Sequence, residues 1–355
     1  MFRILLVASL CLLSGCFTIP MGTDYAGPEA MPAELAAYYS QGSSYQRFRE
    51  VPIEDEKDFV IKRITIESEF GTASVDYFEQ KYRTSDELIL VFPVLGGKNT
   101  IAHYFADYFA RNGYDTAIVQ RNEEFKNPDN FDQIEEVLRK NVVRDRVVLD
   151  LFEREYGKKK FGSLGLSRGA INVAITAGAD PRLRYNVLAL GGSDLPAMFR
   201  DSNQRRIQKY IHYVSEKKNI SSDQVIELLR EEIRTDPKYL ARYIDGRDTL
   251  MILSLFDRTV PVKYGRKLRR QLGYPKTIFL PADHYVALLY TGLIKMAVSD
   301  DPAARGPFSG AFVESEALDF FNEKFDRRRT LYRKYIRPVL HLPLDLVGQT
   351  ADALF

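Results

Sequence analysis

Five consecutive residues, Gly165-Leu166-Ser167-Arg168-Gly169, have the types and spacing that can make a serine nucleophilic. An apolar segment at 159–166 precedes the serine and another at 170–177 follows it, which predicts a strand, a sharp turn and a helix. Glycines at both flanks let the two arms of so tight a turn approach each other. The serine Oγ would then stand exposed at the carboxyl end of the strand. The alternative interpretation is a glycine-rich loop that carries a surface serine.

A serine hydroxyl needs a general base to become a good nucleophile, and the chain has 4 histidines. His284 alone follows the last predicted strand, at 276–280, so a loop at the same sheet edge can bring it to Ser167. His103 and His212 lie in predicted helices, and His341 lies in the C-terminal tail. We interpret these three as surface or packing residues.

The acid that orients the histidine should also follow a strand. Asp257 comes after the predicted strand at 249–255, and its alternative interpretation is a solvated turn residue. Asp194, after the predicted strand at 185–190, is the rival acid. Asp283 adjoins His284, but adjacent side chains on an extended segment diverge. We therefore predict Ser167 as nucleophile, His284 as base and Asp257 as orienting acid, in the chain order Ser, Asp, His.

The segments that must position these side chains alternate between strand and helix, which predicts an α/β sheet. An antiparallel pair is expected at 59–66 and 74–78, and a strand buried on both faces at 87–94. The further strands are expected at 115–119, 159–166, 185–190, 249–255 and 276–280, and the helices at 101–111, 133–156 and 170–177.

Together these features resemble the α/β-hydrolase family over residues 59–325. The segment Val91-Phe92-Pro93-Val94-Leu95-Gly96-Gly97 is similar to the family's strand-end His-Gly-x-Gly-Gly loop, with Pro93-Val94 in place of His-Gly. The turn that begins at Asp257 and ends in Val260-Pro261 is similar to the Asp-x-x-Val-Pro turn in which many members present the acid. The resemblance implies a mostly parallel sheet with helices on both faces.

The resemblance also implies an oxyanion hole. One N–H would come from the strand-end loop, where Leu95 is the candidate and Gly96 its substitute, and the other from Arg168, directly after the nucleophile. The expected activity is cleavage of a carboxylic ester or related acyl bond through an acyl-enzyme; amide, lactone, thioester and lipid substrates stay open. A second hypothesis is a non-catalytic envelope binding protein with the same fold, which the Pro93-Val94 departure favours.

Residues 195–248, between the core parts at 45–194 and 249–325, are predicted to form a helical insert. Ser221 and Gln224 fit a capping box at the start of a helix, and Asp236-Pro237 ends that helical region. In the family such an insert often caps the active site, and we expect Ile211, Leu229 and Tyr239 to influence acyl-chain preference. The alternative is a helical excursion packed beside the sheet.

The N-terminus resembles a bacterial lipoprotein signal. Arg3 precedes an apolar run at 4–13, and Leu13-Ser14-Gly15-Cys16 is similar to a lipobox. The resemblance implies a signal peptide at 1–15, lipidation of Cys16 and a membrane anchor, whereas an ordinary secretory peptide is the alternative. Phe17 is not the aspartate that favours inner-membrane retention, so the outer membrane is expected. Residues 16–44, rich in Gly, Pro, Ala and Ser, are predicted to be a flexible tether.

Charge and cysteine content exclude several classes of protein. With 50 Lys+Arg against 48 Asp+Glu, the net charge of +2 excludes a binding partner held by its phosphate charge, such as nucleic acid. Both cysteines lie in the first 16 residues, so the rest of the chain can form neither a disulfide nor a cysteine zinc site. No cofactor and no metal are predicted. The basic and apolar tail at 326–355 is interpreted as a docked helix, with a membrane-surface role as the alternative.

Overall fold

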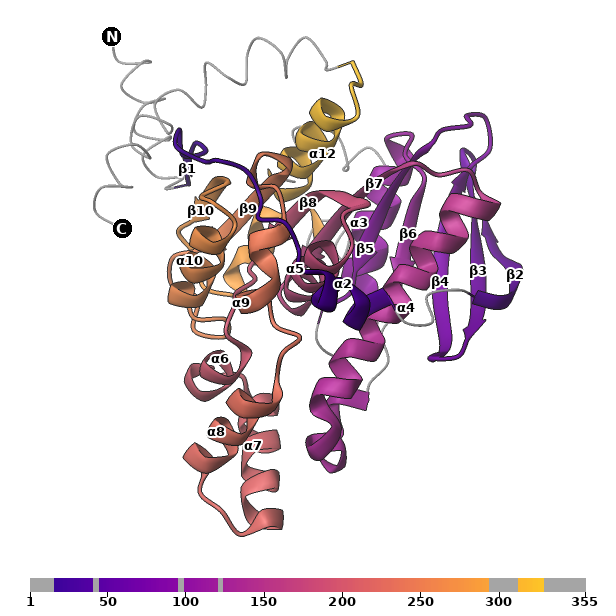
Figure 1. The fold of residues 1–355 in the computed structure, drawn as a ribbon. Helices are drawn as coiled ribbons and strands as arrows, with labels where there is room; N and C mark the ends of the chain where they lie inside the picture. The colour runs from indigo at the N-terminus through magenta and orange to yellow at the C-terminus, as the bar shows by residue number, and fades with distance from the viewer. Residues whose placement is uncertain (1–15, 41–44, 95–98, 121–123, 294–311, 329–355) are drawn as a thin grey trace, which may run out of the picture.

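The computed structural model describes residues 16–40, 45–94, 99–120, 124–293 and 312–328, which form a ten-stranded sheet with helices on both faces (Figure 1). The strand order is β1-β10-β9-β8-β7-β5-β6-β4-β3-β2. The strands are β1 (Phe17–Ile19), β2 (Tyr45–Asp55), β3 (Phe59–Ser68), β4 (Gly71–Gln80), β5 (Glu87–Phe92), β6 (Thr116–Val119), β7 (Lys160–Leu166), β8 (Leu183–Ala189), β9 (Thr249–Ser254) and β10 (Lys276–Leu280).

The middle of the sheet is parallel, from β10 through β9, β8, β7 and β5 to β6. Every residue of β5 is buried, as expected of a strand covered on both faces. Ile89 and Val91 of β5 join the core on one side of the sheet, whereas Leu88, Leu90 and Phe92 join the core on the other. The mostly parallel sheet with helices on both faces that the sequence predicts is confirmed.

Two groups of helices supply these cores. Side chains of α3 (Thr100–Arg111) and α12 (Phe312–Lys324) pack in the first core, and those of α4 (Ile134–Glu155), α5 (Arg168–Ala179) and α10 (Val262–Gln271) in the second. The carboxyl ends of β7, β9 and β10 therefore open at one edge of the sheet, between the two layers. That edge is where residues following these three strands can meet.

The segment predicted as a flexible tether is instead packed on the domain over residues 16–40. β1 adds to the edge of β10, and α2 (Ala33–Ser40) lies beside α4 (Figure 1). Tyr25 donates to the carbonyl of Ile244 over 3.2 Å, and the fully buried Tyr39 hydroxyl lies 3.0 Å from Thr235 Oγ1. Aromatic side chains that pack at intervals hold residues 16–40 on the domain, although their sequence has no periodic hydrophobic pattern.

The insert at 195–248 contains α6 (Leu195–Asp201), α7 (Arg205–Lys218), α8 (Ser222–Glu232) and α9 (Pro237–Leu240). The first three form a group beyond one end of the sheet (Figure 1). Both bonds of the predicted capping box at Ser221 and Gln224 are present, and Asp236 caps α9. Ile211 and Leu229 pack in a hydrophobic cluster that joins the insert to α2, α4 and α5.

The opposite edge of the sheet holds a buried ion pair. Lys158 Nζ contacts Asp115 Oδ2 and donates to the carbonyl of Ser85 over 2.6 Å, and Asp115 Oδ1 accepts from the N–H of Gln80 over 2.7 Å. Both charged side chains are buried. This network joins the residues that lead into β5, β6 and β7, so it fixes the amino ends of the central strands.

The first residues of the predicted tail pack on the domain. Arg327 stacks 3.4 Å over the ring of Tyr114 and donates to Glu87, whereas the tail from 329 on lies outside the described residues.

Among the helices that the structure describes, none has the length and apolar character needed to cross a membrane.

Candidate active site

Ser167 stands in the turn between β7 and α5, where the sequence predicts a nucleophile. Its backbone angles, φ 56° and ψ −119°, are ones that a residue with a side chain rarely adopts. The N–H of Ser167 donates to the carbonyl of Ala189 on the neighbouring strand over 2.8 Å, which holds the turn in place. The hydroxyl is thereby presented at the carboxyl edge of the sheet, half-buried.

The flanking glycines are required by the close approach of backbone to backbone. A Cβ on Gly165 would lie 2.3 Å from the carbonyl carbon of Gly169, and a Cβ on Gly169 would lie 2.1 Å from the carbonyl oxygen of Phe92. Either contact is far shorter than carbon atoms tolerate, so any side chain would displace the turn. The steric reason for which glycines were expected at both flanks of the turn is therefore the one that the structure shows.

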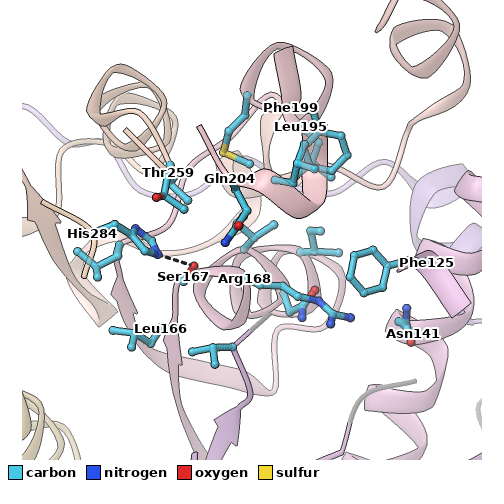
Figure 2. A pocket seen from close by; sticks show the side chains of 18 of the residues that line it. Phe125, Asn141, Leu166, Ser167, Arg168, Leu195, Phe199, Gln204, Thr259 and His284 are labelled. Carbon is cyan, nitrogen blue, oxygen red and sulfur yellow. Dashed lines mark hydrogen bonds between the residues drawn. The ribbon is translucent and has the colours of Figure 1, made fainter. Parts of the chain in front are cut away.

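His284 connects the serine to an acid. Its Nε2 lies 2.9 Å from Ser167 Oγ, and its Nδ1 lies 2.6 Å from Asp257 Oδ2 (Figure 2 shows the first of these contacts). Because an ionised carboxylate can only accept, Asp257 favours the tautomer with the proton on Nδ1. Nε2 is then the acceptor for the serine hydroxyl. Asp257 and His284 are both buried, at 5% and 9% exposure, so water competes little for these bonds.

The loops that carry the acid and the base are joined to each other. Asp257 Oδ1 accepts the N–H groups of Thr259 and Val260, each over 2.9 Å, which turns Oδ2 toward the histidine. The N–H of Phe256 donates to the carbonyl of Ala282 over 3.0 Å, so the pairing of β9 with β10 continues into the two loops. The sheet edge therefore sets the distance between Asp257 and His284.

The other candidates for the acid and the base have different partners. Asp194, at the N-cap position of α6, pairs with Lys267, and Asp283 accepts the N–H groups of Tyr285 and Val286 over 2.8 Å each. The His103 ring packs 5.2 Å from that of Phe78, and the exposed His212 faces Glu216 one turn along its helix. His341 lies outside the described residues.

The structure describes only one of the two predicted oxyanion donors. Arg168 is the first residue of α5, directly after Ser167, and its backbone N–H lies at the positive end of the helix dipole. Leu95, with its possible substitute Gly96, falls in 95–98 and lies outside the described residues.

A cavity of about 300 Å³ opens beside Ser167 and His284, and most of its lining is apolar (Figure 2). One face of α5 forms its floor, with Arg168, Ile171, Asn172, Ile175 and Thr176 at helical spacing. The other walls include residues of α4, of the insert and of the loop after β10. These residues are Leu138, Asn141, Val142 and Asp145; Leu195, Met198, Phe199, Gln204 and Ile207; and Tyr285 and Leu288.

The insert does border the site, but through residues that the sequence analysis did not choose. Leu195, Phe199 and Gln204 line the cavity (Figure 2), whereas Ile211 and Leu229 are buried in the cluster that joins the insert to α4 and α5, and Tyr239 faces solvent. The influence of Ile211, Leu229 and Tyr239 on acyl-chain preference stays a prediction, and it would have to act through the residues that line the cavity. A helical pattern shows which residues share a face but not which neighbour that face meets.

Two polar side chains in the cavity were also missed. Arg168 extends along it and stacks over the ring of Phe125, 3.7 Å from its centroid. Gln204 donates to the Tyr285 hydroxyl over 3.1 Å and so connects the insert to the histidine loop. The position of Arg168, one residue after the nucleophile, could have predicted that its side chain lies in the site. Nothing in the sequence around Gln204 indicates that Gln204 lies there.

No protein-family model matches this chain, and no curated protein matches it either. Among solved structures, it is similar to acetyl xylan esterase 1 from a Thermoanaerobacterium species, with a TM-score of 0.55 and 15% identity over 75% of this chain and 94% of that one. It is also similar to an acetyl xylan esterase from Paenibacillus, with a TM-score of 0.53 and 16% identity over 71% and 87%. A third is the Pyrococcus horikoshii acylaminoacyl peptidase, with a TM-score of 0.52 and 14% identity over 77% of this chain and 43% of that one.

At these identities the likeness establishes the architecture alone. The parallel centre of the sheet, the serine turn after β7, and the acid and histidine after β9 and β10 agree with it. The chain therefore has the α/β-hydrolase fold.

Proposed function

We propose that this protein is a serine hydrolase that cleaves a carboxylic ester or related acyl bond. The observation that carries the proposal is the continuous hydrogen-bonded series from Ser167 through His284 to Asp257 beside an apolar cavity. Buried polar groups need hydrogen-bond partners, and a network with a purely structural role could provide them. Such a network would not need the Ser167 hydroxyl to face a cavity. The solved structures of similar fold are named as esterases and as a peptidase, which agrees with acyl transfer.

In the proposed reaction, Ser167 Oγ attacks the acyl carbon while its proton moves to His284 Nε2. The carbonyl electron pair moves to the oxygen, and the intermediate collapses when the leaving group takes the proton from the imidazolium. Water then repeats the sequence on the acyl-enzyme and releases the acid. Asp257 holds Nδ1–H throughout and stabilises the imidazolium by its charge.

The charge that develops on the acyl oxygen needs donors that are already in place. We assign one to the backbone N–H of Arg168, since it follows the nucleophile and begins a helix. Leu95 is the proposed second donor. Each such donor is worth about 10²–10³-fold in turnover in serine hydrolases that have been dissected by mutation.

Labelling with a fluorophosphonate tests the proposal directly, because the reagent phosphonylates a serine only when a base has activated it. We expect one label per folded chain and none in Ser167→Ala. Ser163→Ala is the matched control: Ser163 lies on the same strand, fully buried and bonded to Asn186, and labelling should persist. A folded wild-type protein that takes no label would favour the non-catalytic envelope binding protein instead.

We further propose that the chain is exported and anchored by lipid at Cys16, in the outer membrane where the host has one. The support is the lipobox-like sequence. In the structure the Cys16 side chain is buried, and burial raises the pKa of its thiol to about 11. A diacylglyceryl group on the sulfur does not fit this buried position, so the anchor proposal requires Cys16 to leave the core once it is lipidated.

A Cys16→Ser variant should no longer fractionate with membranes, or should keep its full-length mass because processing stops. Thioether formation needs the sulfur, and a hydroxyl cannot replace it. Membrane fractionation followed by mass measurement checks both outcomes. Cys11→Ser, in the predicted signal peptide, is the control and should behave as the wild type. Unchanged fractionation and mass in Cys16→Ser would dismiss the lipid anchor.

A further inference from the structure

The N-terminal attachment point lies at the active-site edge of the sheet. β1 pairs antiparallel with β10, with Phe17 opposite Phe279. Cys16 is therefore beside the carboxyl end of β10, whose last residue, Leu280, comes four positions before His284. Cys16 packs in the same cluster as Leu280 and Ala287. The first residue that the structure describes, Cys16, therefore lies near the histidine loop.

Exposed apolar side chains gather at the same place. We call Phe256, Tyr285, Val286 and Leu289 the mouth patch; their exposed fractions are 64%, 59%, 42% and 60%. All four lie in the two loops that carry Asp257 and His284, and the backbone bond from Phe256 to Ala282 keeps these loops together. The charged side chains in these loops that face solvent, Arg258 and Asp283, are of opposite sign. The patch therefore has no strong electrostatic preference.

The mouth patch is continuous with the cavity. Tyr285 belongs to both, and Leu288, between the exposed Val286 and Leu289, lines the cavity beside His284. An apolar path thus leads from the protein surface to Ser167. Four large exposed apolar groups in two adjacent loops are unusual for a surface that meets only water.

We infer that the mouth patch docks on a lipid bilayer and that the substrate is an acyl ester drawn from that bilayer. This rests on the proposed hydrolase function. The occupant is a lipid surface because the proposed lipid anchor is at Cys16, and Cys16 lies beside the histidine loop that carries most of the patch; the inference therefore also rests on the proposed anchor. The anchor brings the mouth patch to the membrane at high effective concentration, so a small patch suffices to hold it there.

The orientation can be measured without any reaction. A single cysteine at Leu289, labelled with an environment-sensitive fluorophore, is compared with one at Tyr82 in the full chain carrying Cys11→Ser. Tyr82 is 82% exposed and precedes β5, so it lies at the opposite edge of the sheet. The parent without an engineered cysteine gives the background.

On addition of phosphatidylcholine vesicles, we expect the fluorophore at position 289 to shift to the blue and to be quenched severalfold by spin-labelled lipid. The fluorophore at position 82 should change little. Equal responses at both positions, or no association with vesicles, would overturn the inference. A fluorophore at 289 that is already in an apolar environment before vesicles are added would also overturn it, because the chain itself or a partner copy would then cover the patch.

Activity gives a second measure. In Leu289→Asp, hydrolysis of a long-chain p-nitrophenyl ester held in vesicles should fall about tenfold or more, because a charge replaces a buried leucine at the membrane. Hydrolysis of p-nitrophenyl acetate in water should stay within about twofold, since Leu289 does not line the cavity. Tyr82→Asp should leave both rates unchanged. Equal loss on both substrates would contradict membrane docking.

The two proposals can fail separately. If the protein hydrolyses no ester but the fluorophore at position 289 enters the bilayer, the docking surface stands and the hydrolase proposal falls. If p-nitrophenyl acetate is cleaved and the fluorophores respond alike, the hydrolase stands and the docking surface falls.

Discussion

Replacing Asp257 by asparagine should lower turnover on an ester by up to about 10⁴-fold in a protein that still folds. Asparagine keeps the size of the side chain, and its amide oxygen can still accept the N–H groups of Thr259 and Val260. Its NH₂ would then face His284 and donate to Nδ1, which leaves the proton on Nε2. The imidazole could no longer take the proton of Ser167. Steady-state kinetics with a p-nitrophenyl ester, together with circular dichroism, measure the loss and the fold.

Asp194→Asn is the control for this experiment. Asp194 also follows a buried strand, but its carboxylate pairs with Lys267 and is not bonded to His284. Turnover should stay close to that of the wild type, with a modest loss of stability from the ion pair. The reverse pattern would move the acid to Asp194, and wild-type rates in both variants would dismantle the proposed triad.

Replacing Lys158 by methionine should lower the free energy of unfolding by about 3–5 kcal/mol, because Asp115 would remain as a buried charge without its cation. Methionine retains the apolar stem that packs between the strands. Lys160→Met is the matched control: Lys160 is largely exposed, its carboxylate partner Asp86 is 3.9 Å away, and its loss should cost well under about 1 kcal/mol. Urea unfolding of both variants measures the difference.

The cost should depend on pH in a definite direction. Burial raises the pKa of Asp115, and the charge of Lys158 opposes that rise. Without Lys158 the pKa in the folded state rises further above the unfolded value. Such a group stabilises the fold at low pH, and this contribution is lost as the pH rises through the folded pKa. Lys158→Met should therefore regain stability from pH 7 toward about pH 5, and Asp115→Asn added to it should restore stability at pH 7. A pH-independent deficit would assign the effect to lost packing.

The parallel centre of the fold could be read from the sequence because its causes are local. The run in β5 is apolar without interruption, and Gly165 and Gly169 are dictated by contacts within their own turn. Ser167 comes directly after β7, and His284 lies in the loop after β10, four positions beyond its last residue, so both could be predicted once these strands were. Placing them needed only the strand order of a known fold.

What could not be read depends on contacts distant in sequence. β1 has only three residues, and it is a strand because the edge of β10 offers hydrogen bonds to it. β2 was missed because most of its side chains are exposed, so no apolar alternation marks it. Asp194 and Asp257 both follow buried strands; only the turn after Asp257 favoured it in the sequence, and their partners in the structure, Lys267 and His284, separate them. The lining of the cavity by Phe199 and Gln204 depends on how the insert packs, which no local pattern records.

The pairing of β1 with β10 also bears on the order of events during synthesis. Phe17 and Phe279 are partners separated by 262 positions, so β1 can pair with β10 only after the chain through β10 has been synthesised. At ordinary rates of translation this takes roughly 10–50 s. Cys16, which is buried in the finished domain, cannot reach its place in the core until β10 exists. The last step in building the ten-stranded sheet from its described strands is therefore the closure of an N-terminal strand onto a C-terminal one.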